Sequence, residues 1–256
     1  PVFFAFALIS MDDATLYVYD GALDPKLVSG EAKVGSYFDI FDDIKKLPHD
    51  AVMILNGVEA SYSLMKSVPD GVKIINEPGP AQVLKAVKNA EEIRSTLNAH
   101  IKDGTAMVNF LYWLKNSIGK IRISEISAAD YLEKCRRAQE GCFDLSFPTI
   151  AGFNAHGAIV HYGATPETDS VLEPHGFLLV DSCGQYWDGT TDITRTIVLG
   201  PLNDKMKECY TAVLKGHIAL ATTVFAADTK CSDIDKPVHE PLKALGLDYG
   251  HGTGHG

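Results

Sequence analysis

Two aspartates flank a glycine- and threonine-rich segment. Asp181 ends the apolar run GFLLVD, and Asp192 stands eleven positions later, before the β-branched run TRTIVL. The turn dipeptide Asp188–Gly189 between them indicates a hairpin. If that hairpin folds about Tyr186–Trp187, the two aspartates lie directly opposite each other with Cβ atoms about 5 Å apart on one face. Two carboxylates this close repel unless a proton or cation lies between them, and hard cations prefer oxygen ligands.

A purely structural interpretation of the same spacing stays open. Aspartates at strand ends often accept backbone N–H hydrogen bonds in turns. The neighbouring threonines are also common strand residues; they are Thr190, Thr191, Thr194 and Thr196. The spacing alone therefore does not choose between a metal site and an ordinary hairpin.

The segment HGTGHG, residues 251–256, adds two imidazoles. His251 and His255 are four residues apart, but the interleaved glycines argue against a helical zinc motif. In an extended segment an even separation places both rings on one side, and glycine lets the backbone approach closely. A flexible segment without function is the alternative. Four other histidines are expected to be surface or packing residues: His156, His175, His217 and His239.

Composition restricts the classes of partner. The 256 residues suffice for one large and one small domain, and 46% of them are hydrophobic, enough for a buried core. The net charge is −10, and no stripe of lysine and arginine occurs. We therefore expect neither nucleic acid nor a membrane as a partner.

The cysteines and the first residues indicate a cytoplasmic protein. Five cysteines without a C-x-x-C spacing are typical of reduced thiols. The opening PVFFAFALIS lacks a basic flank and is too short to cross a bilayer, so it is neither a signal peptide nor a membrane span. Because the chain starts without methionine inside an apolar run, we interpret it as a fragment whose first residues lie in a strand.

Strand and helix patterns alternate through the first part of the chain and predict a small α/β domain over residues 1–84. Its boundary is expected around EPGPAQ, residues 77–82, where two prolines flank a glycine. The predicted strands cover 1–10, 15–20, 51–56 and 72–77, and the predicted helices cover 35–47 and 59–68.

Residues 85–256 are expected to form an α+β domain that holds the chemistry. Asn89 with Glu92 three residues later predicts a capping box at the start of a long helix, which ends near Gly119. A second helix is predicted over 127–141 and a third from Asn203. The segment between them, including GAIVHYG, is rich in β-branched residues and turn signals and is predicted to form strands.

Several of these motifs together resemble one family. The segments FPTI…GAIVHY, LLVDSCGQYWDGTTDITRT, LKGHIALATTVF and GLDYGHGTGHG are similar to the cytosolic Xaa-Pro aminopeptidases, also called aminopeptidase P. The run DSxGQYxDGTTDITRT is the most specific, because the related prolidases usually lack DGTTD. The resemblance extends from about Lys85 to Gly256 and more weakly to PVFF. It implies a pita-bread catalytic domain, of which 85–256 is the N-terminal part, after a partial creatinase N-terminal-like domain at 1–84.

The resemblance also implies roles for individual residues. Asp181, Asp192 and His255 match metal ligands, with Asp192 bridging two ions. His161 and His251 match histidines that hydrogen-bond the substrate and assist proton transfer. The implied cofactor is a pair of Mn²⁺ ions, with Zn²⁺ or Co²⁺ as possible substitutes. The implied substrate is a peptide with proline in second position.

The chain departs from the family pattern at its end and near Pro237. The family site has five protein ligands, of which two glutamates lie downstream of HGTGHG, so we expect this fragment to be inactive or nearly so. Pro237 and Pro241 argue against one well-formed helix there.

Residues 228–256 are expected to lack packing partners. A homodimer, or self-association through unpaired FLLV and TIVL edges, is expected.

Two rival functions remain open. A prolidase-type enzyme would cleave only dipeptides, and a non-catalytic pita-bread module would bind peptides without metal. Retention of Asp181, Asp192 and His255 argues against the second, because a binding module does not need metal ligands.

Overall fold

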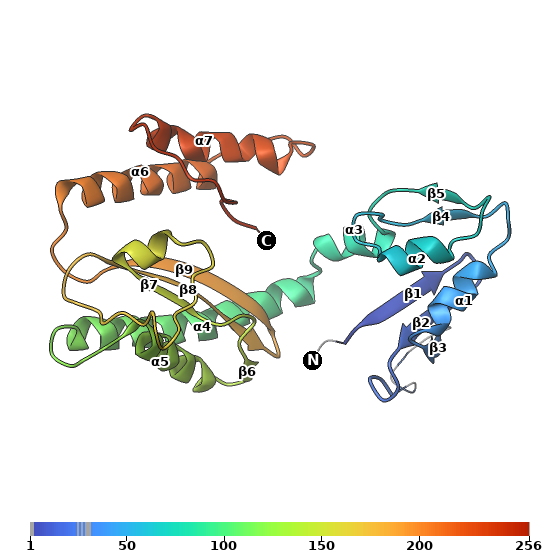
Figure 1. The fold of residues 1–256 in the computed structure, drawn as a ribbon, viewed down its shortest axis with the longest axis horizontal. Helices are drawn as coiled ribbons and strands as arrows, with labels where there is room; N and C mark the ends of the chain where they lie inside the picture. Colours follow the sequence, from blue (N-terminus) through green and yellow to red (C-terminus); the bar gives the residue numbers. More distant parts are fainter. Residues whose placement is uncertain (1–2, 25, 27, 29–31, 256) are drawn as a thin grey trace. The chain divides into compact units, whose positions relative to one another are not determined.

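The computed structural model describes residues 3–24, 26, 28 and 32–255 and divides into two compact units. The first unit ends at Lys88 and the second begins at Asn89 (Figure 1). The predicted boundary between residues 84 and 85 lies inside α3 (Pro80–Ala86), a few residues before this division. Residues 1–2 of the first predicted strand and Gly256 of HGTGHG lie outside the described residues.

The N-terminal unit is a small α/β domain, as predicted. Strand β2 lies between an antiparallel β1 and a parallel β3, and β4 pairs with β5 in parallel. Tyr17, Ile40, Ile44 and Leu64 form its buried core. Its elements are β1 (Ala5–Ile9), β2 (Ala14–Val18), β3 (Ala32–Ser36), α1 (Asp39–Lys45), β4 (Val52–Ile54), α2 (Tyr62–Ser67) and β5 (Lys73–Ile75).

The second unit begins with the predicted capping box. The Asn89 side chain accepts from the Glu92 backbone N–H at 2.9 Å, and the Glu92 carboxylate accepts from the Asn89 N–H at 2.8 Å. This arrangement satisfies two helix N–H groups that have no partner inside the helix. The helices are α4 (Ala90–Ser117), α5 (Glu125–Arg137), α6 (Asp204–Ala221) and α7 (Cys231–Lys243).

The helix pair α4–α5 packs against an antiparallel sheet (Figure 1). Its central strand β8 (Phe177–Tyr186) pairs with β9 (Gly189–Val198) along one side. Along its other side β8 pairs with β7 (Ile150–Phe153) and β6 (Cys142–Asp144). In the segment FLLV of β8, Leu178, Leu179 and Val180 are paired on both sides, so the prediction of this segment as an open edge is wrong.

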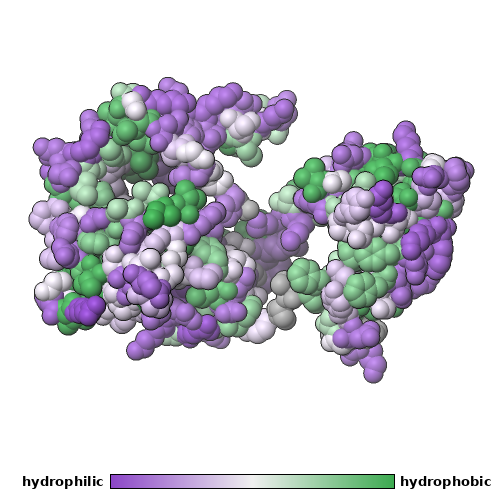
Figure 2. Space-filling model, in the orientation of Figure 1, coloured by the Kyte–Doolittle hydropathy of each residue, from purple (hydrophilic) through white to green (hydrophobic). Residues whose placement is uncertain are grey.

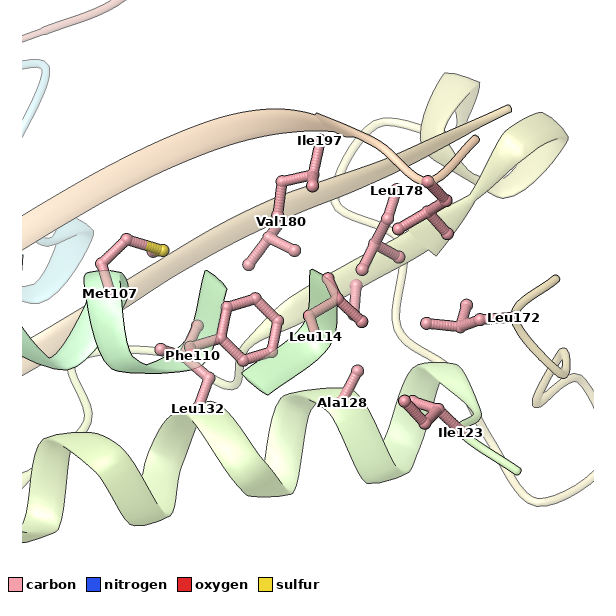
Figure 3. Packing of buried hydrophobic residues seen from close by; sticks show 12 residues of the cluster. Met107, Phe110, Leu114, Ile123, Ala128, Leu132, Leu172, Leu178, Val180 and Ile197 are labelled. Atoms are coloured by element: carbon pink, nitrogen blue, oxygen red, sulfur yellow. The ribbon is translucent and has the colours of Figure 1, made fainter. Parts of the chain in front are cut away.

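Alternation along β8 and β9 gives the sheet one apolar face. Leu178, Val180 and Ile197 point from that face toward Phe110 and Leu114 of α4 (Figure 3). Since successive strand residues face opposite sides, the intervening positions of β8 and β9 belong to the other face. The aspartates of interest occupy that second face, so the core packing of α4 against the sheet determines which way they point.

Helix α7 contradicts the expectation about its prolines. Pro237 and Pro241 both lie inside one helix, Cys231–Lys243. Each removes a backbone donor, but Val238 and Leu242 are buried on the side that packs against α6. A Cβ at Gly216 of α6 would lie 2.3 Å from the Val238 carbonyl oxygen, so the two helices pack closely. Burial of this face outweighs the lost hydrogen bonds, and the expectation that 228–256 lacks packing partners is wrong for α7.

Within the described residues, none of the helices has the length and apolar character needed to cross a membrane.

Candidate functional site

The hairpin register places Asp181 and Asp192 diagonally on one face of the sheet. Asp181 pairs with Thr194, and Asp192 pairs with Cys183. The prediction of direct opposition is wrong because the two-residue turn is Trp187–Asp188, one position later than expected. That change slides the pairing by two residues. Since the side-chain period of a strand is two, both carboxylates keep the same face.

The two carboxylates are close enough for the charge of one to affect the other. Burial raises the pKa of Asp192, and the negative charge of Asp181 raises it further. The Asp181 carboxylate also accepts a hydrogen bond from the Thr194 hydroxyl at 2.7 Å, which fixes its orientation. An ionised pair in this position is unfavourable without a counter-charge. This face of the hairpin therefore attracts a cation.

His255 provides a third donor at the same place. Its Nε2 lies 3.3 Å from Oδ2 of Asp192 and lowers the pKa of that carboxyl, against the effect of Asp181. The His255 side chain is 78% exposed. The chain thus returns from α7 to the aspartate face, as the sequence prediction for a joint site requires.

The predicted substrate-side histidines are accessible. His251 is exposed, has its ring tilted against that of Tyr249 with centroids 4.8 Å apart, and has its Nδ1 2.9 Å from the Gly252 carbonyl oxygen. His161 is exposed too, but the prediction of a strand there is wrong. It follows the 3-10 helix Asn154–Ala158 in a turn and has a left-handed backbone with φ of 56°. Such a conformation is uncommon outside glycine and occurs often at functional sites.

The donor set suits a divalent cation in its chemistry but is incomplete in its arrangement. Asp181 and Asp192 supply carboxylate oxygens and His255 supplies an imidazole, a mixture that fits Mn²⁺ or Zn²⁺. Within the described part of the chain, however, no three His, Cys, Asp or Glu side chains converge closely enough to hold a metal ion. The described residues therefore present two carboxylates with a nearby histidine and lack a closed coordination shell.

A buried ion pair beneath the hairpin was not predicted. The guanidinium of Arg136 donates from Nε and Nη2 to the Asp103 carboxylate at 2.6 and 3.0 Å. Tyr186 of β8 donates its hydroxyl to the same carboxylate at 2.9 Å. Both charged side chains are 0% exposed. The cluster joins α4, α5 and the hairpin. The sequence shows two adjacent arginines, Arg136 and Arg137, and only the packing of the folded chain reveals that Arg136 is the buried one.

Glu125 organises the segment that leads to His161. Its buried carboxylate accepts from the backbone N–H groups of Phe153 and Ser170, at 2.7 and 3.0 Å. It also accepts from the Tyr162 hydroxyl at 2.9 Å and contacts His156 Nδ1 at 2.9 Å. Four groups between residues 153 and 170 thus meet at one side chain. The expectation of His156 as a simple surface or packing residue did not foresee this contact.

Comparison with family models assigns both units. Residues 94–256 match the metallopeptidase family M24, and residues 1–92 match the creatinase/prolidase N-terminal domain. These matches agree with the predicted order of a creatinase N-terminal-like domain followed by a pita-bread domain.

Relatives of known sequence match over the whole chain. Aminopeptidase P1 of Arabidopsis thaliana is 34% identical over 312 residues, covering 100% of this chain and 47% of its own length. A probable Xaa-Pro aminopeptidase P of Sordaria macrospora is 38% identical over 272 residues, covering 100% of this chain and 44% of its own length. The chain thus spans a little under half the length of these relatives.

Solved structures give the same result. X-prolyl aminopeptidase from Caenorhabditis elegans, described as a cytosolic enzyme with a di-nuclear active site, has a TM-score of 0.90 and 28% identity. The match covers 100% of this chain and 44% of the Caenorhabditis elegans chain. Prolidase from Pyrococcus furiosus has a TM-score of 0.70 at 23% identity, covering 94% of this chain and 69% of its own, and shows the fold alone. The predicted resemblance is confirmed: the chain belongs to the metallopeptidase family M24 and is similar to its Xaa-Pro aminopeptidases.

Proposed function

We propose that the chain is part of a cytoplasmic, manganese-dependent Xaa-Pro aminopeptidase, which releases the N-terminal residue from peptides with proline second. The observation that carries this proposal is the pair Asp181 and Asp192 on one face of the sheet, with the pKa of Asp192 raised and His255 3.3 Å from it. Similarity to Xaa-Pro aminopeptidases over the entire chain supports the same reaction.

In this proposal the chain supplies three ligands and two substrate histidines. Asp181, Asp192 and His255 would hold the two ions, with Asp192 as the shared ligand. Such an ion pair, when bound, polarises the scissile carbonyl and makes the attacking water more acidic. His161 and His251 hydrogen-bond the peptide and assist proton transfer. Proline after the scissile bond removes the amide N–H, so recognition has to act on the ring and the tertiary amide.

The domain division and the metal are part of the proposal. We assign residues 1–84 to the partial N-terminal domain and residues 85–256 to the N-terminal part of the catalytic domain; the compact second unit begins at Asn89. Mn²⁺ is the proposed ion because carboxylate and imidazole ligands suit it, and Zn²⁺ or Co²⁺ could replace it.

Two alternative functions remain. A dipeptidase stays open because the fold is shared with the Pyrococcus furiosus prolidase and so does not separate the two activities. A non-catalytic peptide-binding module is favoured by the lack of a closed metal-binding group in the described residues. A protein of the relatives' length that carries this chain separates the three. An aminopeptidase cleaves Ala-Pro-Pro, a dipeptidase cleaves only Ala-Pro, and a binding module cleaves neither.

The 256-residue chain by itself should show little or no peptidase activity and weak Mn²⁺ affinity. Two carboxylates and one imidazole cannot neutralise and fix two dications. Release of alanine from Ala-Pro-Pro with added Mn²⁺ tests this, with calorimetric Mn²⁺ titration beside it. If the chain alone released alanine as fast as a full-length Xaa-Pro aminopeptidase does, the prediction would be wrong.

The chain should self-associate or form a homodimer. In the described part of the chain β9 pairs only with β8, so the edge carrying TIVL is open and can pair with another chain. Hydrophobic residues are also exposed on the surface of this unit (Figure 2), among them Tyr210, Val213, Leu214 and Ile218 of α6.

Light scattering across a concentration series measures this association. Thr196→Lys, which adds a charge to the exposed part of β9, should weaken it. A stable monomer at high concentration would overturn the expectation.

A further inference from the structure

The side chain of His239 lies between two carboxylates. Its Nε2 is 3.2 Å from Oδ2 of Asp235, one turn earlier on α7. Its Nδ1 is 2.5 Å from Oδ1 of Asp248, in the segment that follows α7. The His239 side chain is only 15% exposed. This ring therefore joins the helix to the segment that leads into HGTGHG.

The geometry specifies the charge of the ring. A neutral imidazole has one N–H donor, whereas a carboxylate only accepts. Because both ring nitrogens of His239 face carboxylate oxygens, both contacts become hydrogen bonds only in the imidazolium form. The carboxylate of Asp248, and then that of Asp235, accordingly raise the pKa of His239. His239 in turn lowers the pKa of Asp248.

Further contacts continue from this bridge toward the motif. Tyr249 stacks on His239 with ring centroids 4.2 Å apart at 20°, and its ring also contacts that of His251 in a tilted arrangement at 33°. The Tyr249 hydroxyl lies 2.5 Å from the Thr253 hydroxyl. The Thr253 hydroxyl also lowers the pKa of Asp235. Residues 248, 249 and 253 are thus tied to α7 or to each other.

The rest of the motif has almost no packing. A Cβ at Gly250, Gly252 or Gly254 would meet nothing within 4 Å. His255 is largely exposed, and its contact with Asp192 joins two exposed groups, which alone contributes little. The position of the motif therefore depends on its attachment to α7. Helix α6 approaches α7 closely at Gly216 and Val238, and the charged groups that act on His239 are Asp248 and Asp235.

We propose that His239 is a positioning residue: its imidazolium form bridges Asp235 and Asp248, holds residues 248–255 on α7, and so determines where His251 and His255 stand relative to Asp192. The attachment itself requires no catalysis. Its consequence for turnover rests on the proposed function.

The bridge depends on pH in a defined direction. His239 has a folded-state pKa above its ordinary value of about 6.5. A raised histidine pKa stabilises the attached state fully below the ordinary value, and the stabilisation is lost as the pH rises through the raised value. The segment should be held at pH 6 and released at pH 9.

Chymotrypsin cleavage after Tyr249 in the 256-residue chain measures release of the segment. The cleaved fraction at Tyr249–Gly250 is followed by mass spectrometry, and each variant is compared with the unchanged chain at the same pH, so that the protease's own pH dependence cancels. At pH 6, His239→Gln should be cleaved about tenfold faster, because charge-assisted hydrogen bonds are lost. At pH 9 the two chains should be cleaved at equal rates.

Two further variants separate the bridge from general damage. His239→Arg keeps a cation at both pH values and should restore slow cleavage at both. Asp248→Asn, in the segment outside α7, should behave like His239→Gln at pH 6 even if the latter disturbs the helix. His217→Gln on the exposed side of α6 is the matched control and should match the unchanged chain.

Equal cleavage of His239→Gln, Asp248→Asn and the unchanged chain at pH 6 would overturn the proposal, as would a His239→Arg chain that is cleaved as fast as His239→Gln. No peptidase activity enters this measurement. Its failure would therefore leave the proposed function untouched, and an inactive enzyme would leave the attachment of the segment untouched.

Discussion

Asp192→Asn should abolish Mn²⁺-dependent release of the N-terminal residue by a protein that carries this chain and has its relatives' length. A bridging carboxylate neutralises both ions, and a neutral amide cannot. In the metal-free 256-residue chain, by contrast, the same substitution should increase the stability of the fold. Because the folded state raises the pKa of Asp192, its ionised form costs stability at all pH values above that pKa. The substitution should therefore raise the thermal midpoint at pH 7 and reduce the further increase caused by Mn²⁺.

Two other substitutions test the assignment of roles at this site. His161→Ala should lower turnover by about 10²–10⁴-fold while the metal stays bound, as expected for a lost proton-transfer group. Thr190→Ala, on the same strand and face as Asp192 and hydrogen-bonded to Gln185 at 2.7 Å, should leave Mn²⁺ binding unchanged. If His161→Ala removes the metal, the histidine is a ligand and our assignment is wrong.

Asp103→Asn should lower the unfolding free energy of the C-terminal unit by about 3–5 kcal/mol, the range for breaking a buried ion pair from one side. Arg136 would keep its charge at 0% exposure, without a counter-ion. Its Nη1 already lacks a partner among the described side chains, so nothing nearby compensates. Urea unfolding monitored by tryptophan fluorescence reports on this unit, because Trp113 and Trp187 are the only tryptophans in the chain.

Matched variants separate the buried charge from general damage to α4. Glu91→Gln removes one partner of the exposed Glu91–Arg94 pair on the same helix and should change stability by less than about 1 kcal/mol. Asp103→Leu combined with Arg136→Met and Tyr186→Phe should regain most of the loss, because apolar replacement of a whole buried pair is often neutral. A loss of under 1 kcal/mol for Asp103→Asn would show that the pair is dispensable.

Local signals predicted the elements that position the site. The capping box at Asn89 was visible because its two partners are three residues apart. The alternating pattern of the hairpin strands was visible because one face packs on α4. These features depend on neighbours in sequence, and sequence motifs then sufficed to predict the family.

Features that depend on tertiary packing were not predictable. The dipeptide Asp188–Gly189 indicates a turn, but its exact centre decides whether Asp181 opposes Asp192 or Thr194. Helix α7 tolerates Pro237 because its opposite side is buried against α6, which the local pattern does not reveal. The buried contacts of Arg136 likewise depend on α4 and β8, which are distant in the sequence.

The metal site is tested most directly by a crystal structure, with Mn²⁺, of a protein that carries this chain and has its relatives' length. Anomalous scattering is measured above and below the manganese absorption edge. We expect two anomalous peaks within ligand distance of the hairpin face, with Asp192 coordinating both, Asp181 one and His255 the other. Peaks coordinated by other residues, or a folded and Mn²⁺-saturated protein without peaks at these three side chains, would contradict this expectation.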